Sequence, residues 1–540
     1  MTPLRKREHW GSSLGVILAM AGNAVGLGNF LRFPVQAAKN GGGAFMIPYF
    51  ISFLLIGLPL MWVEWTIGKR AGLLGHSSTP GAYESIWRSP IAKYLGIMGI
   101  LFPLIIVTYY IYIESWCLGY SILSVVGQLP KMPALVDTGV AQVLKPFADF
   151  LSGYQQSRIL AGGNIIVPSV ACYFFFIITL ALNVWILSLG IKKGIEILAK
   201  IAMPVLFLMA AALVVRVFTL GAPVHPDQTS LAGMAFLWEP QWEALLRPSV
   251  WLAAAGQIFF TLSLGFGAII TYASYLKEDE DIALNGLATA SANEFAEVIL
   301  GGSIAIPAAV VFFGIAGARD IAAGGAFNLG FITMPAIFSS IPYGNIFSAL
   351  WFGLLFLAGI TSSVALSQPI IAFLEDEFAW SKLRAALTLG IFLLIFTHIP
   401  IMLRGALDEM DFWAGTFGLV LGAAVEVILL MWIFGSDRAW EELHQNALIR
   451  VPRLFMYITK FVTPVILLII LAAWTVMDII APAVKTMATQ GFIGWLNGFI
   501  GSGIGVWTGR LFMVAVAVLF AIMINSAWRG RRSQNNGGAS

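Results

Sequence analysis

The chain has 540 residues, of which 59% are hydrophobic and 11% are charged, and its formal net charge is +3. Soluble domains carry about 25% charged residues, so this composition excludes an ordinary soluble protein. The basic residues are dispersed and form no tract interleaved with aromatic side chains, which excludes nucleic acid as a partner. Apolar runs of about 20 residues recur along the chain, and each is long enough to cross a bilayer as a helix. The sequence therefore predicts an all-α polytopic membrane protein.

The apolar runs predict about twelve transmembrane helices. In chain order these spans cover residues 11–40, 44–68, 94–126, 165–187, 195–220, 250–276, 293–313, 346–374, 385–403, 412–434, 454–480 and 511–527. A glycine-rich, apolar loop at 322–342 is expected to fold over one mouth of the protein. Lys and Arg gather in the N-terminal segment and in the loops of the same parity, so we expect a multi-pass protein of the inner cell membrane with both termini in the cytoplasm.

The first span is interrupted by residues 22–29, which contain three glycines and two asparagines. Glycine costs roughly 1 kcal/mol relative to alanine inside a helix and asparagine favours caps and turns, so this stretch predicts two half-helices joined by unwound backbone. Unpaired backbone groups at membrane depth are tolerated only inside protein or beside a wet cavity. The break therefore predicts a buried polar site. For this stretch alone, a glycine-rich face for close helix packing is the alternative.

The sixth span carries a second polar, glycine-bearing interruption at residues 260–267. Breaks at corresponding places in two halves of a membrane protein indicate an inverted-repeat secondary transporter with its binding site near the bilayer midplane. We therefore predict a first five-helix repeat over 11–220, an inverted five-helix repeat over 246–434, and two additional helices over 454–527.

The polar groups at these breaks suit a carboxylate and a monovalent cation. Half-helix ends offer amide donors to an anion, and unwound carbonyl groups offer oxygen atoms to a cation. Asn29, Thr261, Asn293, Thr361 and Ser362 add neutral oxygen atoms. Mg²⁺ and Ca²⁺ prefer carboxylates, so sodium is the expected ion. For each of these side chains taken alone, an interhelical hydrogen bond is the alternative role.

Several ionisable residues lie inside the predicted spans, where each costs about 2.5–3.5 kcal/mol unless it has a partner or a wet cavity. They are Glu64, Glu114, Glu297, Glu426, Arg32 and Asp411. Arg32 lies one turn beyond Asn29, and Asp411 precedes the tenth span, so these two are candidates for a water-mediated outer gate. A static ion pair is the alternative.

Four motifs, at residues 7–10, 22–34, 256–263 and 408–416, resemble the neurotransmitter:sodium symporter family over nearly the whole chain, and most closely its bacterial members. Paired broken helices are a known feature of this family, so they do not support the resemblance independently of the motifs. The resemblance implies a LeuT-type fold with broken helices 1 and 6. It also implies sodium-coupled import of neutral, aliphatic amino acids by alternating access, with two sodium ions.

The resemblance also implies the residues that bind each ion and the substrate. The first sodium ion would bind the substrate carboxylate together with Ala24, Asn29, Thr261 and Asn293. The second would bind Gly22, Val25, Ala358, Thr361 and Ser362. The amino acid would contact Ala24, Leu27, Gly28, Ile106, Tyr110, Phe260, Thr261, Ser263, Phe266, Ser362 and Leu366.

By the same resemblance, two gates would close over the substrate. The outer gate would consist of Arg32, Tyr110, Phe260 and Asp411, and the inner gate of Arg7, Trp10, Ser274, Tyr275 and Asp376. Glu297 matches a position where chloride-dependent members carry a small hydroxyl residue, so its carboxylate would replace chloride.

Other classes of function have weaker support. A non-transporting amino-acid sensor of the same fold is the alternative that we keep. The sequence holds no phosphate-binding loop of the G-x-x-x-x-G-K-[ST] type, so an ATP-driven pump is not expected. Its five histidines lie in loops or at a span end, so no enzyme is expected. The lipid bilayer and sodium are the expected partners besides the substrate, and a homodimer is left open.

Overall fold

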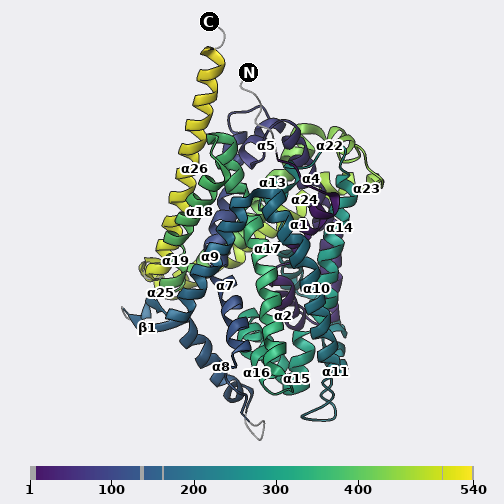
Figure 1. The fold of residues 1–540 in the computed structure, drawn as a ribbon, viewed down its shortest axis with the longest axis vertical. Helices are drawn as coiled ribbons and strands as arrows, with labels where there is room; N and C mark the ends of the chain where they lie inside the picture. Colours follow the sequence, from purple (N-terminus) through teal and green to yellow (C-terminus); the bar gives the residue numbers. More distant parts are fainter. Residues whose placement is uncertain (1–7, 134–138, 161–162, 501–502, 538–540) are drawn as a thin grey trace.

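The computed structural model describes residues 8–133, 139–160, 163–500 and 503–537. Long helices run side by side along the longest axis of the molecule, and the N-terminal end of the described chain lies at the same end of the bundle as the C-terminal part of α26 (Figure 1). Within the described residues, nine helices are long and apolar enough to cross a membrane, and a bent pair makes ten. One of the nine, Val170–Phe218, is two helices joined at Gly190, whose φ is +77°. The sixth span is split into two shorter helices and is not among these ten. Counting Val170–Phe218 as two spans and adding the sixth span gives the twelve predicted spans.

The first six spans are formed by α1 (Ser13–Ala24) with α2 (Phe33–Lys39), α3 (Met46–Ser52) with α4 (Leu58–Leu73), α7 (Met98–Val125), α9 (Val170–Gly190), α10 (Glu196–Phe218), and α12 (Pro248–Thr261) with α13 (Ala268–Ser274). The others are formed by α14 (Ile282–Glu294) with α15 (Ala305–Ala323), α17 (Gly344–Phe378), α18 (Lys382–Phe396) with α19 (His398–Met402), α20 (Ala406–Met410) with α21 (Gly418–Val427) and α22 (Ser436–Leu443), α23 (Arg453–Tyr457) with α24 (Thr463–Trp474) and α25 (Ala481–Ile500), and α26 (Ile504–Gly537). The loops contain α5 (Thr79–Ile86), α6 (Ala92–Leu95), α8 (Val140–Gln155), β1 (Gln156–Leu160), β2 (Ile165–Pro168), α11 (Ser230–Trp238) and α16 (Met334–Ser339).

Several predicted span boundaries differ from the helices by more than four residues, and two of these differences have a clear physical reason. Residues 165–168, assigned to the fourth span, form β2, which pairs antiparallel with β1, because the run of β-branched residues there favours a strand. The helix α9 begins after Ser169, whose hydroxyl caps the amide of Cys172. The seventh span begins at Ile282 and not at residue 293, since Asp281 caps α14. The prediction started it too late because the polar side chains of this first part, such as Thr289, are buried in the core.

The predicted break in the first helix is confirmed. The helix α1 ends at Ala24, Val25 is extended (φ −76°, ψ 91°), and the two half-helices are bent by 48°. A π-helical turn, Gly28–Arg32, leads into α2. A Cβ atom on Gly28 would lie 2.5 Å from the ring of Phe260, so only glycine permits this approach between the two broken helices.

The predicted break in the sixth helix is confirmed as well. The helix α12 ends at Thr261, and α13 begins at Ala268. Between them Ser263, Gly265 and Gly267 have positive φ angles of +54°, +76° and +73°. Such a run is incompatible with a continuous helix, so the backbone here is unwound.

Candidate functional site

The two unwound segments meet in the core of the bundle. The hydroxyl of Ser263 donates to the carbonyl oxygen of Asn23 at 2.9 Å, which joins one break to the other. The amide of Gly265 donates to Glu64 Oε1 at 2.8 Å, so a buried carboxylate of α4 supports the unwound part of the sixth span. Backbone groups freed from helices are thus satisfied by protein, as burial at membrane depth requires.

The four predicted protein ligands of the first sodium ion, three side chains and the carbonyl group of Ala24, are neighbours. Asn29 Nδ2 lies 3.0 Å from Thr261 Oγ1 and 2.8 Å from the side-chain amide of Asn293. The amide of Asn293 in turn lies 3.2 Å from the carbonyl oxygen of Ala24. Asn29, Thr261 and Asn293 are at most 1% exposed. This cluster, called the asparagine cluster below, offers neutral oxygen atoms in a small buried volume.

Glu297 is the carboxylate that makes the most hydrogen bonds to this asparagine cluster, and Glu294 Oε1 lies 3.5 Å from Asn293 Nδ2. Glu297 accepts a hydrogen bond from Asn29 Nδ2 at 3.0 Å and another from the hydroxyl of Thr261. Gln257 Nε2 and the hydroxyl of Tyr49 donate to its other oxygen at 2.9 and 3.0 Å. Neither donor was predicted. Gln257 lies within the motif at 256–263, which was a signal, whereas nothing in the sequence marks Tyr49.

The residues of the predicted second sodium site lie between α1 and α17. The hydroxyl of Ser362 is 3.3 Å from the carbonyl oxygen of Gly22 and 3.0 Å from that of Ala358. The hydroxyl of Thr361 is 3.2 Å from the carbonyl oxygen of Ala358. Val25 is the extended residue that ends α1. This group of carbonyl and hydroxyl oxygens, called the α1–α17 cluster below, contains no charged residue.

The predicted substrate residues line the same region. Tyr110 presents its hydroxyl 3.4 Å from the amide of Leu27, and a Cβ atom on Gly26 would lie 3.0 Å from Ser362 Oγ. Ile106 is one turn before Tyr110 on α7, and Leu366 is one turn after Ser362 on α17, so each shares a face with its polar neighbour. The apolar side chains are buried: Ile106, Phe266 and Leu366.

On one side of the breaks, Arg32 lies above Phe260, with its guanidinium carbon 4.5 Å from the ring centroid. Asp411 accepts a hydrogen bond from the hydroxyl of Tyr109 at 2.6 Å. In the described part of the chain no direct ion pair joins Arg32 to Asp411, so their gate stays a prediction.

At the other end, Trp10 packs edge-on against Tyr272 and donates from Nε1 to its carbonyl oxygen at 2.9 Å. Tyr275 accepts a hydrogen bond from Gln368 at 3.1 Å. Ser274 lies one residue before Tyr275 and donates its hydroxyl proton to its own helix. Asp376 accepts from the amide of Ser77 at 2.6 Å. Arg7, the remaining predicted member of the inner gate, lies outside the described residues.

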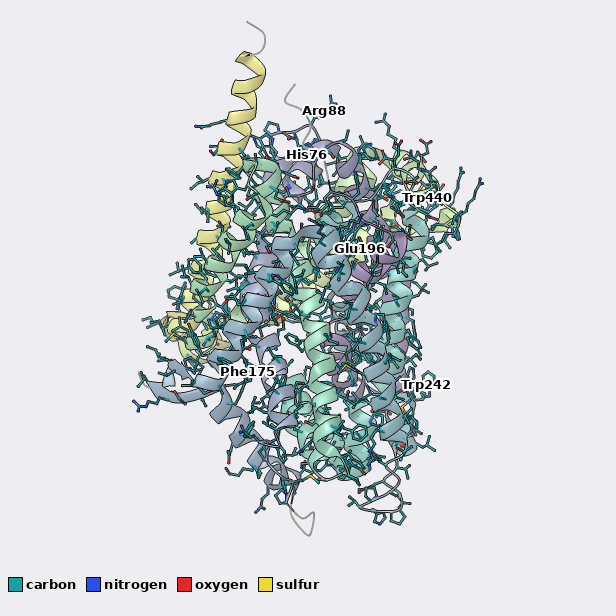
Figure 2. All side chains as sticks on the ribbon, viewed as in Figure 1. His76, Arg88, Phe175, Glu196, Trp242 and Trp440 are labelled. Atoms are coloured by element: carbon teal, nitrogen blue, oxygen red, sulfur yellow. The ribbon has the colours of Figure 1, made fainter. Side chains whose placement is uncertain are left out.

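Two acidic residues that the sequence analysis did not single out attach the N-terminal segment to neighbouring helices. Glu196 accepts hydrogen bonds from Gly11 N at 2.6 Å and Ser12 Oγ at 3.0 Å. It lies in the same half of the bundle as Arg88 and Trp440 (Figure 2). Glu8 pairs with Lys382 at 2.5 Å. The segment leading into α1 is therefore held at this end by carboxylates.

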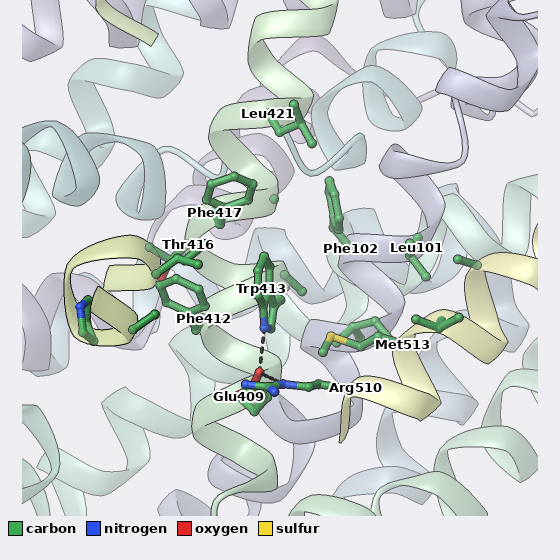
Figure 3. A pocket seen from close by; sticks show the side chains of 18 of the residues that line it. Leu101, Phe102, Glu409, Phe412, Trp413, Thr416, Phe417, Leu421, Arg510 and Met513 are labelled. Carbon is green, nitrogen blue, oxygen red and sulfur yellow. Dashed lines mark hydrogen bonds and ion pairs between the residues drawn. The ribbon is translucent and has the colours of Figure 1, made fainter. Parts of the chain in front are cut away.

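A cavity of about 1300 Å³ lies away from the two breaks, between α7, the tenth span, α25 and α26. Its walls are mostly apolar side chains such as Phe102, Phe412 and Phe417 (Figure 3). Its charged residues are already paired, because Glu409 accepts from Arg510 at 2.5 Å and from Trp413 at 2.6 Å. With its charges paired and its walls mostly apolar, this cavity is a poorer candidate for the functional site.

Two broken helices that meet around buried, neutral oxygen donors, inside a bundle of membrane-spanning helices, are the architecture of a secondary transporter. The family model described as the sodium:neurotransmitter symporter family matches residues 7–137 and 155–526. The chain belongs to this family.

Individual relatives agree with the family assignment. An uncharacterised sodium-dependent transporter of Methanocaldococcus jannaschii is 32% identical over 468 residues, which is 86% of this chain and 89% of that relative. The sodium-dependent nutrient amino acid transporter 1 of Drosophila melanogaster is 29% identical over 520 residues, covering 87% of this chain and 77% of the relative. The crystal structure of MhsT in complex with L-phenylalanine has a TM-score of 0.72 and 32% identity, and covers 86% of this chain and 99% of MhsT. The family is one of symporters, and the Methanocaldococcus and Drosophila relatives are named as transporters, so the chain is a transporter and not an enzyme, as the sequence predicts.

Proposed function

We propose that this protein imports neutral, aliphatic amino acids by alternating access, driven by two sodium ions and without a chloride requirement. The observation that carries the proposal is that the two unwound segments meet beside the asparagine cluster and the α1–α17 cluster, where neutral oxygen atoms lie next to backbone amides of the first break. The relatives support an amino acid as the substrate, because one is named for nutrient amino acids and MhsT holds phenylalanine.

The first sodium ion would bind at the asparagine cluster. The carbonyl of Ala24 and the side chains of Asn29, Thr261 and Asn293 would supply protein ligands, and the substrate carboxylate would supply another. Neutral oxygen donors suit a monovalent ion better than a divalent one, which supports sodium. Because this site would be incomplete without the amino acid, ion and substrate would bind together, and this shared ligand couples their transport.

The second sodium ion would bind at the α1–α17 cluster, with ligands from Gly22, Val25, Ala358, Thr361 and Ser362. A cation shared by carbonyl groups of α1 and hydroxyl groups of α17 would hold these helices together. The carboxylate of the amino acid would lie on the amides of Leu27 and Gly28 and on the hydroxyl of Tyr110, where the half-helix end favours an anion.

The carboxylate of Glu297 would provide the negative charge beside the first sodium ion. It accepts hydrogen bonds from Asn29 and Thr261, two of the proposed ligands, so its charge would lie next to the ion. This contact supports transport that does not need chloride. With two sodium ions and a zwitterion, two charges would cross the membrane, each worth about 2.3 kcal/mol per 100 mV.

We also propose the cytoplasm for both termini and the inner cell membrane for the chain, on the distribution of Lys and Arg among the loops. The division into repeats at 11–220 and 246–434, with two further helices at 454–527, remains our assignment. A homodimer in the bilayer is left open.

The proposal is tested by uptake of labelled leucine, alanine and phenylalanine into proteoliposomes with an inward sodium gradient, with potassium as the control cation. We expect accumulation that needs sodium, persists without chloride, and falls about tenfold at limiting sodium in Thr361→Val. That variant keeps the side-chain shape but removes one hydroxyl ligand, a loss of about 1.4 kcal/mol.

Two results would contradict the symporter. Sodium-dependent binding without accumulation or exchange would identify the sensor alternative. Exchange that does not depend on sodium would show that the proposed ion sites are wrong.

A further inference from the structure

A buried polar chain crosses three helices next to the α1–α17 cluster, and neither the ion sites nor the substrate pocket uses it. Ser363 Oγ on α17 donates to Asn183 Oδ1 on α9 at 2.7 Å. Asn183 Nδ2 then donates to Glu114 Oε1 on α7 at 3.1 Å. Glu114 and Ser363 are fully buried and Asn183 is 1% exposed. A chain of this kind, sealed inside a membrane protein, is costly unless each member is satisfied.

The helices approach closely at this level. A Cβ atom on Gly359 would lie 3.0 Å from Glu114 Cγ, so the absence of a side chain there lets α17 pack against α7. Gly359 and Ser363 are four residues apart, which places both on one face of α17. That face is therefore fixed by α7 and α9 through both packing and hydrogen bonds.

The ion-binding residues of α17 lie on a neighbouring face of the same turns. Ala358 and Ser362 are also four residues apart, and Thr361 lies between them in the sequence. Successive residues of an α-helix are rotated by 100°, so the direction of Ser363 determines the direction of Ser362 and Thr361. The distance of 3.3 Å between Ser362 Oγ and the carbonyl oxygen of Gly22 on α1 therefore depends on the rotation of α17 about its axis.

We infer that Glu114, Asn183 and Ser363 are positioning residues for the second sodium ion: they lock the rotation of α17 so that Thr361 and Ser362 face α1. This inference rests on the proposed function of the α1–α17 cluster. None of the three touches the ion. They act through the helix that presents its ligands.

The test measures uptake in proteoliposomes as a function of sodium concentration, in Asn183→Leu and Ser363→Ala. Loss of one interhelical hydrogen bond should raise the half-saturating sodium concentration about 3- to 20-fold, while the maximal rate at saturating sodium is retained. A purely structural role would do the opposite, because fewer folded molecules lower the maximal rate at an unchanged half-saturating concentration. The double variant should match the stronger single variant, since both break the same chain.

Ser367→Ala is the matched control. Ser367 is buried on the same face, one turn further along α17, and its hydroxyl donates only within its own helix, to the carbonyl of Ser363 at 2.8 Å. It should behave like the parent. Glu114→Gln keeps an oxygen acceptor for Asn183 and should also behave like the parent, whereas Glu114→Leu should behave like Asn183→Leu.

Thr361→Val separates this inference from the function on which it rests. If Thr361→Val leaves the sodium dependence unchanged, the proposed second ion site is wrong. If Thr361→Val weakens sodium dependence while Asn183→Leu and Ser363→Ala keep the parent's half-saturating concentration, the positioning role alone is overturned. A shift in Glu114→Gln as large as that in Asn183→Leu would overturn the hydrogen-bond mechanism.

Discussion

The asparagine cluster and the α1–α17 cluster are built differently although both use neutral oxygen atoms. In the first, amide and hydroxyl side chains converge from both unwound segments and from α14, and a carboxylate holds them from behind. In the second, the hydroxyl of Ser362 on α17 contacts the carbonyl oxygen of Gly22 on α1, and the hydroxyl of Thr361 bonds within α17. The first geometry is fixed by a network of side chains. The second depends on how two helices lie relative to one another.

This difference predicts different responses to substitution. A side-chain network leaves several buried groups unsatisfied when one member is removed, and each costs about 1–3 kcal/mol. A cluster made largely of carbonyl oxygens keeps most of its donors after any single change, and responds instead to changes in helix spacing. The two clusters can therefore be told apart by the size and kind of effect that each substitution produces.

The largest effect is expected for Asn29→Ala. Asn29 contacts Thr261 and Glu297 through its amide nitrogen and accepts from Gly26 N at 2.8 Å through its oxygen. Leaving two of these groups unpaired costs about 3 kcal/mol or more, so sodium-dependent uptake at limiting sodium should fall more than 100-fold. Uptake in proteoliposomes measures this. Asn40→Ala, at the end of α2 with partners only on Gln36, is the matched control. Uptake by Asn29→Ala within tenfold of the parent would contradict a network-built site.

The break in each of the two interrupted helices could be predicted from local chemistry, because glycine disfavours a helix interior in both segments and asparagine adds to this in the first. The residues that contact those breaks could not be predicted from the sequence. The bond from Gly265 N to Glu64 joins residues 201 positions apart, and nothing near either residue indicates it. Sequence reasoning did identify Glu64, Glu114, Glu297 and Glu426 as groups in need of partners, because a membrane-embedded carboxylate is costly.

The loops and span ends were harder to predict than the spans. The helix α8 and the strand β1 lie between the third and fourth predicted spans, where no element was predicted, and β2 lies within the start of the predicted fourth span. Hydropathy identifies segments that face lipid and not segments whose polar side chains face the protein core. The prediction therefore missed most of α14, whose polar side chains face the core. Ser263 has a positive φ of +54°, and its residue type gives no local signal for that conformation.

An intermediate effect is expected for Glu297→Ser, which removes the charge behind the asparagine cluster. Without chloride, uptake should fall about 30-fold, roughly 2 kcal/mol, because the proposed sodium ion loses a neighbouring negative charge in a buried site. Added chloride should restore a substantial part of the rate, since the smaller side chain leaves room for an anion beside Tyr49 and Gln257. The measurement is uptake with chloride or gluconate as the anion. Equal rates in both anions, for a folded variant, would show that Glu297 has no such role.

The smallest effect is expected for Gly22→Ala, which tests whether the α1–α17 cluster depends on helix spacing. A Cβ atom on Gly22 would lie 3.1 Å from Thr361 Cβ, so α1 and α17 must separate by a few tenths of an ångström. Such overpacking costs about 1 kcal/mol, which should raise the half-saturating sodium concentration about fivefold without removing any ligand. Gly256→Ala is the control, because the nearest atom to its added Cβ would be 3.5 Å away. If Gly22→Ala instead abolished uptake as fully as Asn29→Ala, spacing and side-chain ligation would contribute equally, and the distinction between the two clusters would fail.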